Sequence, residues 1–142
     1  MAILPTYRPV ELSFPVPRHL HLTLQAHLTF LGNCSMIHLT TSTIGEGSST
    51  HPPLGSFVYA MPDRLDAQNA ISTALSTEGS SIDYATRLSK ILARRFNHPV
   101  YVGCSMSFAG LTAEEEMEGI AAVVGKILEA ADKNKVETSK AS

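Results

Sequence analysis

The side chains most able to do chemistry in this chain are its six histidines and two cysteines. His19 and His21 lie two residues apart in an alternating segment, so on a strand both point the same way, and His27 shares that face. An H-x-H pair holds zinc only if further ligands converge from elsewhere. Because no acidic cluster or Cys-x-x-Cys accompanies them, we interpret these histidines as polar residues on the less apolar face of a strand.

Motifs for nucleophilic or phosphate chemistry are also incomplete. Residues 103–107, GCSMS, lack the final glycine of the G-x-S-x-G motif, and residues 45–50, GEGSST, lack the lysine of a phosphate-binding loop. Cys34 and His38 are spaced like metal ligands, but one such pair specifies no site. The sequence therefore predicts no catalytic residue, metal or cofactor, and a small enzyme that uses Cys104 or the histidines stays an alternative.

The composition is typical of one folded domain. The chain has 142 residues, 44% of them hydrophobic, and a formal charge of −2, which disfavours both disorder and a dedicated nucleic-acid binder. Two cysteines do not make a disulfide scaffold, so we expect free thiols in a reducing compartment. Prolines interrupt the N-terminal segment, and no apolar run approaches the ~20 residues of a membrane helix. We expect a cytoplasmic protein that is also present in the nucleus and contacts no membrane.

Hydrophobic periodicity predicts the order of the elements as four strands, a helix, a strand and a helix. The clearest signal is the alternation over residues 20–30, followed by strand-like residues 35–43, 55–61 and, more weakly, 69–76. We expect residues 1–17 to form an extended proline-rich arm, 18–133 a single domain and 134–142 a polar flexible tail. The fold class is α+β, with a mainly antiparallel sheet of five to six strands and two helices on one face.

Two helices follow from capping patterns and from 3.6-residue periodicity. Ser80 and Asp83 have capping-box spacing before the first helix, and Thr112 and Glu115 have it before the second. Asn97-His98-Pro99 ends the first helix, and a strand follows over residues 99–108. The expected apolar faces consist of Tyr84, Leu88, Ile91 and Leu92 in the first helix, and of Met117, Ile120, Ala121, Val124, Ile127, Leu128 and Ala131 in the second.

Two surfaces are candidates for binding a partner. The strands over 55–61 and 99–108 are apolar on both faces, which is typical of strands buried on both faces. Since two helices cover only one face, we expect a second subunit on the face that carries Tyr59 and Tyr101, in a sheet-on-sheet contact. On the first helix Arg87, Lys90 and Arg94 form a basic stripe, which is either a solvated face or a docking face for an acidic partner. The overall acidity disfavours nucleic acid there.

Several segments within residues 55–130 resemble the fungal form of proteasome assembly chaperone 4. The resemblance lies in residues 56–61 (SFVYAM), 84–90 (YATRLSK), 97–105 (NHPVYVGCS) and 115–118 (EEME). It implies a small α+β subunit that pairs with the sister proteasome assembly chaperone 3. The heterodimer would bind alpha-type subunits of the 20S proteasome, with alpha-5 as the expected one, promote alpha-ring assembly and leave before the particle matures.

The resemblance also implies the absence of catalysis, cofactor and nucleotide. It does not extend to the N-terminal arm or to the loop with Pro52-Pro53, for which no role is predicted beyond a guess that residues 45–54 contact the proteasome subunit. A trafficking adaptor on a similar scaffold is a further alternative, because fold alone does not decide function.

Overall fold

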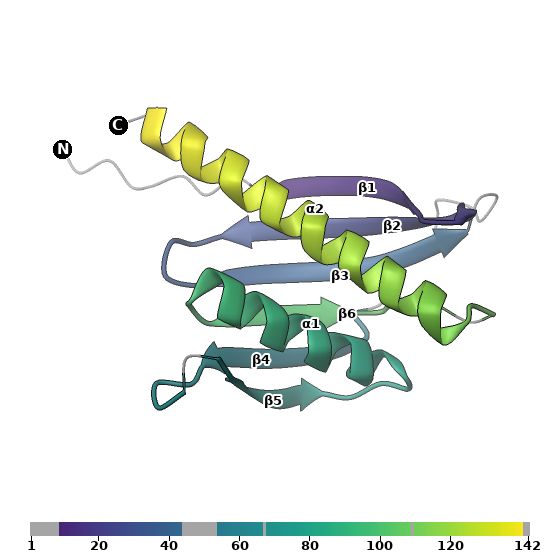
Figure 1. Ribbon diagram of the computed structural model, residues 1–142, viewed down its shortest axis with the longest axis horizontal. Helices are drawn as coiled ribbons and strands as arrows, with labels where there is room; N and C mark the ends of the chain where they lie inside the picture. The colour runs from purple at the N-terminus through teal and green to yellow at the C-terminus, as the bar shows by residue number, and fades with distance from the viewer. Residues whose placement is uncertain (1–8, 44–53, 67, 109, 141–142) are drawn as a thin grey trace.

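The fold was described from a computed structural model that covers residues 9–43, 54–66, 68–108 and 110–140. It has two layers, a twisted sheet and a pair of helices that cross it (Figure 1). The elements in chain order are β1 (Val10–Val16), β2 (His19–Phe30), β3 (Ser35–Thr43), β4 (Ser56–Pro62), β5 (Ala70–Ser76), α1 (Ser81–Phe96), β6 (Val100–Cys104) and α2 (Ala113–Lys140). The prediction for residues 44–53 lies outside the described part of the chain.

The six strands form one sheet in the order β1-β2-β3-β6-β4-β5. All neighbouring pairs are antiparallel except β3 and β6, which run parallel and are separated along the chain by β4, β5 and α1. The predicted α+β class, with a mainly antiparallel sheet and two helices on one face, is confirmed. The predicted order of elements lacked one strand, β1.

Strand β1 corrects the prediction of an extended arm for the residues that it contains. Val10, Leu12 and Phe14 alternate with polar residues and pack against the core, and β1 pairs with β2 along its length. The prolines argued against a strand, but β1 lies at the edge of the sheet, where a residue without an N–H is tolerated. The register shifts at Pro15. Residues 1–8 lie outside the described residues.

Helix α2 also differs from the prediction at both its end and its buried face. It continues to Lys140, through residues that we had assigned to a polar tail. Met117, which we placed on the apolar face, is 66% exposed, and Ala121 is exposed as well. The buried residues are instead Ile120, Val123, Ile127, Ala130 and Ala131, a face turned slightly away from the predicted one. None of the described helices is long and apolar enough to span a bilayer.

The core lies between the helices and one face of the sheet. Leu88 and Leu92 of α1 are fully buried, as predicted, whereas Tyr84 and Ile91 lie at the margin of the contact. Helix α1 packs on β4, β5 and β6, and α2 packs on β1, β2 and α1. The two halves of the sheet are thus each covered by one helix, and both helices use the same face.

The structure confirms two of the three helix ends that the sequence predicted. Thr112 and Glu115 form the predicted capping box: the Glu115 N–H donates to Thr112 Oγ1, and the Thr112 N–H donates to the Glu115 carboxylate. Asn97 ends α1 in the left-handed conformation, at φ 56°. The Ser80 side chain, by contrast, makes no capping hydrogen bond, so the predicted capping box at α1 is wrong.

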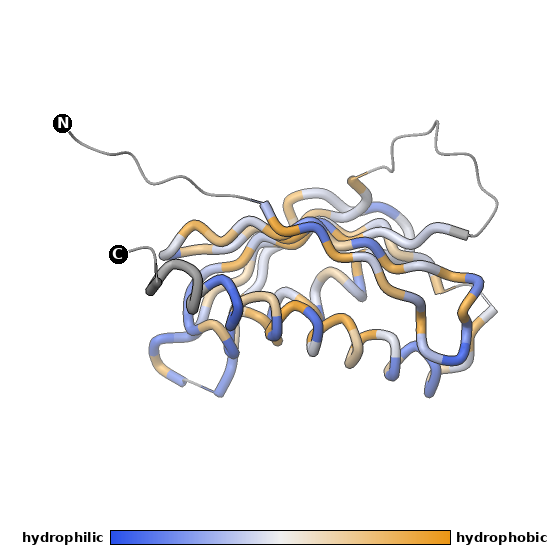
Figure 2. Tube along the Cα trace, turned by 90° about the horizontal axis from the view of Figure 1, so that it is seen from above, coloured by the Kyte–Doolittle hydropathy of each residue, from blue (hydrophilic) through white to orange (hydrophobic). Residues whose placement is uncertain are grey.

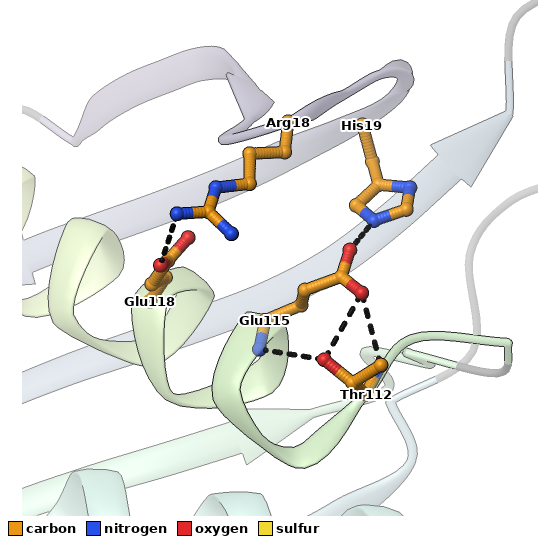
Figure 3. Close-up of polar contacts among 5 residues, drawn as sticks. All are labelled: Arg18, His19, Thr112, Glu115 and Glu118. Atoms are coloured by element: carbon orange, nitrogen blue, oxygen red, sulfur yellow. Dashed lines mark hydrogen bonds and ion pairs between the residues drawn. The ribbon is translucent and has the colours of Figure 1, made fainter.

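The first two turns of α2 are fixed to the β1–β2 hairpin by polar side chains (Figure 3). His19 at the start of β2 bonds to the Glu115 carboxylate, and Arg18 in the hairpin turn pairs with Glu118 at 3.2 Å. The hydrogen bonds from Thr112, together with the nearby charges of His19 and Arg18, lower the pKa of Glu115. These contacts, which we call the hairpin clamp, set where α2 begins its path across the sheet.

Candidate partner-binding surface

The candidate site is the face of the sheet opposite the helices, which we call the open face. Figure 2 shows both helices on one side of the sheet, and no described helix covers the other side. Because side chains alternate along a strand, the burial of Val58, Ala60, Val100 and Val102 under the helices places their neighbours on the open face. These neighbours include the aromatic residues of β4 and β6.

Five ring-bearing side chains extend across the open face from β2 to β4. Tyr59 and Tyr101, directly paired across β4 and β6, have ring centroids 4.8 Å apart. Phe57 lies 6.0 Å from the Tyr101 ring and stacks on His38 at 6.3 Å. His38 is in turn 6.4 Å from His27 on the neighbouring strand. We call this set the aromatic row.

Gly103 allows the aromatic row to pass over β6. It pairs with both His38 and Phe57, and a Cβ at this position would lie 2.7 Å from His38 Nδ1 and 2.7 Å from Leu54 Cδ1. Contacts below 3.0 Å are not tolerated without a shift of the neighbours. The absence of a side chain at Gly103 therefore lets His38, Phe57 and Leu54 approach one another above the strand.

A hollow of about 750 Å³ lies beside the aromatic row on the open face. Its polar lining comes from Glu11, Ser13, Gln25, His27, His38 and Thr40, with Leu54 and Gly103 at its apolar side. Burial lowers the pKa of His38, and the neighbouring His27 lowers it further, so the neutral imidazole is favoured. The open face thus offers flat apolar rings next to a concave polar region, a combination found where proteins bind other proteins.

The predicted binding residues fall into two separate places. Tyr59 and Tyr101 lie together on the open face, whereas the basic stripe lies on α1, in the other layer. Arg87, Lys90 and Arg94 line a second hollow, of about 300 Å³, with the start of β5. Arg94 donates to the carbonyl of Gln68 at 3.1 Å. Among the described residues no carboxylate forms an ion pair with the three basic side chains.

The histidines that suggested a metal site do not come together. His19 belongs to the hairpin clamp, His21 is exposed beside it, and His27 lies further along β2 on the open face. Within the described ranges, no three His, Cys, Asp or Glu side chains are grouped so that they could hold a metal ion. The prediction that His19 shares one face of the strand with His21 and His27 is therefore wrong for His19, because the register shift at Pro15 turns the end of the hairpin toward α2.

The cysteines do not form a disulfide and differ in their surroundings. Cys34 is partly exposed, and Cys104 is buried under the helices. The pKa of the Cys104 thiol is raised to about 11. Burial is the cause of the increase, and a backbone hydrogen bond involving Met106 lowers the pKa and offsets part of it. A thiol that stays protonated at neutral pH is a poor nucleophile. The geometry gives the enzyme alternative no activated cysteine at this position.

The sequence analysis missed His27, His38 and Phe57 as members of one surface. The contact between Phe57 and His38 depends on β6 lying between β3 and β4. That strand order is not visible in a periodicity pattern. Gly103, the glycine within the strand-like residues 99–108, was the available signal, since a strand glycine often marks a close approach.

Comparison with known proteins identifies the family to which this chain belongs. A family model described as proteasome assembly chaperone 4 matches residues 23–106, which is more than half of the chain. The chain belongs to the proteasome assembly chaperone 4 family. The matched segment contains β3, β4, β5, α1 and β6 with most of β2, and hence most of the open face. As a member of this family, the chain is a proteasome assembly chaperone.

The fold agrees with this membership. It is similar to a chain in a crystal structure described as a novel chaperone complex for yeast 20S proteasome assembly, with a TM-score of 0.61 and 18% identity. The match covers 89% of this chain and 96% of the yeast one, so it extends beyond the segment of the family match. No match was found among curated proteins.

Proposed function

We propose that this chain is one subunit of a heterodimeric chaperone for the 20S proteasome. Its partner is the sister proteasome assembly chaperone 3, which binds to the open face. The heterodimer binds an alpha-type proteasome subunit, with alpha-5 as the first candidate, and promotes alpha-ring assembly without catalysis. The cytoplasm, with the nucleus as a second compartment, is where we expect it to act.

The aromatic row is the observation that carries this proposal. A sheet of six strands with helices on one face leaves the rings of Phe57, Tyr59 and Tyr101 partly exposed. Aromatic side chains concentrated at the centre of a surface are typical of binding hot spots. A second sheet packed on this face would produce a sandwich about 10 Å thick, in which both sheets are covered. The similar yeast chain comes from a complex, which supports a partner for this fold.

The basic stripe is the proposed contact for the alpha-type subunit. Arg87, Lys90 and Arg94 are exposed and lie on the other layer of the molecule, so the sister does not compete for them. Charged contacts of this kind accelerate association and remain reversible, because they bury little apolar surface. Reversibility is needed in a chaperone that leaves before the particle matures.

The proposal is tested by co-purification of the tagged chain from cells that express both proposed partners. The chain should recover the sister chaperone together with an alpha-type subunit. Replacing Tyr59 and Tyr101 by aspartate places two charges on the open face, and recovery of the sister should fall by at least about tenfold. If the unmodified chain recovers neither protein, or purifies as a stable monomer in the presence of the sister, the proposal is wrong.

A matched control separates loss of binding from loss of folding. Met117 is an exposed apolar residue on the first part of α2, so Met117→Asp adds a charge to the other layer. This variant should recover the sister at the level of the unmodified chain. Circular dichroism of both variants then shows whether the open-face variant is folded.

A further inference from the structure

The two edges of the sheet are protected very differently. At one edge, β1 carries Glu11, Pro15 and a register shift, three features that prevent another strand from pairing. The C-terminal half of α2 also crosses above this edge (Figure 1). At the other edge, β5 has the sequence AISTALS, without a proline or a charged residue. The β5 edge is the one place where the described sheet can be extended.

The backbone of β5 is regular and accessible along most of its length. Its pairing with β4 runs without interruption from Ala74 to Ala70, so the outward N–H and C=O groups of this stretch form a continuous ladder. Ile71 and Leu75 are 51% and 54% exposed. Unpaired backbone groups beside exposed apolar side chains are the usual template for strand addition.

The side chains around this edge specify the charge of an added strand. On the helix side β5 presents the small residues Ala70, Ser72 and Ala74, which leave room above them. The hollow of about 300 Å³ lies there, lined by Arg87, Lys90 and Arg94 together with residues at the start of β5. On the open-face side, Ile71 pairs with Met61, and both are exposed. An added strand would therefore meet cations on one side and apolar groups on the other.

We infer that β5 accepts an extended segment of a client protein by strand addition, and that this segment alternates acidic with apolar or small side chains. Its backbone pairs with the free edge of β5, and its acidic residues reach Arg87 and Lys90 across the small residues of the strand. Identification of the client as a proteasome subunit rests on the proposed function, whereas strand addition itself does not. The open face remains free for the sister.

A second copy of this chain is a poorer occupant of the same edge. Pairing two β5 strands would bring the α1 helices of both copies next to each other. The two basic stripes would then face one another, and like charges at short range repel. Charge complementarity thus favours an acidic segment from a different protein.

The test uses the full chain and a short fluorescent peptide in which threonine alternates with glutamate. The peptide should bind with an affinity that falls as salt is added, and hydrogen exchange should show new protection at β5. A peptide with lysine in place of glutamate should bind about tenfold more weakly or not at all. The double variant Arg87→Glu/Lys90→Glu should lose at least about tenfold in affinity for the acidic peptide.

The double variant Lys126→Glu/Lys133→Glu is the matched control, since it reverses two charges near the β1 edge and should keep the affinity. The inference is overturned if the acidic peptide does not bind at millimolar concentration, or if protection appears away from β5. It is also overturned if light scattering shows that the chain alone dimerises with β5 already protected. Capture of the sister in cells is measured separately, so failure of the inference is distinguishable from failure of the proposed function.

Discussion

The two faces of the sheet use the same strands for different purposes. On β4 and β6, Val58, Val100 and Val102 are buried to 1% exposure or less under the helices, while Tyr59 and Tyr101 emerge on the opposite side. One set of side chains holds the chain in its own fold, and the alternate set is left for another molecule. Alternate residues of the same strand therefore serve the stability of the fold and the binding of a partner. A single substitution can change one of these properties without the other.

The largest expected effect is a loss of stability on the covered face. Leu88 is fully buried between α1 and the sheet, so Leu88→Ala should cost about 2–5 kcal/mol of unfolding free energy. Urea denaturation of the isolated chain measures this loss. Met117→Ala, at an exposed position on α2, is the control and should stay within about 0.5 kcal/mol. Equal effects would show that the two layers are not packed as described.

An intermediate loss of stability is expected at Gly103, where the side chains of His38 and Leu54 lie close to the backbone of β6. Gly103→Ala places a Cβ against His38 and Leu54, and should cost about 1–3 kcal/mol unless both side chains move aside. The displaced rings should also weaken sister binding. The same denaturation series and a pull-down test both effects. A substitution without any consequence would mean that the aromatic row does not close over β6.

Whereas Leu88→Ala should mainly reduce stability, Tyr59→Thr should mainly reduce binding of the sister. It removes a partly exposed ring and its contact with Tyr101 but introduces a β-branched residue that suits a strand, so the isolated chain should lose less than about 1 kcal/mol of unfolding free energy. Recovery of the sister should fall far more strongly, because the ring is proposed to be buried only in the complex. Denaturation and co-purification of one sample compare the two quantities. A large loss of stability with intact binding would contradict the division between faces.

The smallest effect concerns pH and the hairpin clamp. Because the pKa of Glu115 is lower in the folded chain than in the unfolded one, its carboxylate stabilises the fold at pH above the unfolded-state pKa. This contribution is lost as the pH falls through the folded-state pKa. Glu115→Gln should therefore reduce the dependence of stability on pH in the acidic range, measured by denaturation at several pH values. Glu114→Gln, in the same helical turn, should retain that dependence.

The sequence predicted well those elements whose signal is local. The alternation of residues 20–30 specified β2, and Thr112 with Glu115 specified the start of α2. Strand β1 was missed because its prolines are acceptable only at a sheet edge, a position that depends on the other strands. The buried face of α2 was predicted slightly out of phase, since Met117, although apolar, lies on the exposed side of the helix.

The candidate surfaces were predictable to a similar extent. Tyr59 and Tyr101 could be placed on one face from strand parity, and the structure pairs them directly. The addition of His27 and His38 required the position of β6 between β3 and β4, which comes from packing. The free edge of β5 likewise follows only from the order of the strands. Hydrophobic periodicity therefore identifies the individual strands but does not predict their order within the sheet.

The central position of β6 has a consequence for how the chain is made. The strands that β6 joins, β3 and β4, leave the ribosome well before residues 100–104 do. Until then the two halves of the sheet have exposed inner edges, and the pairs that close them are distant in sequence, which slows folding. During its own synthesis, this assembly chaperone therefore passes through an interval in which its nascent strands are open to misassociation with other chains.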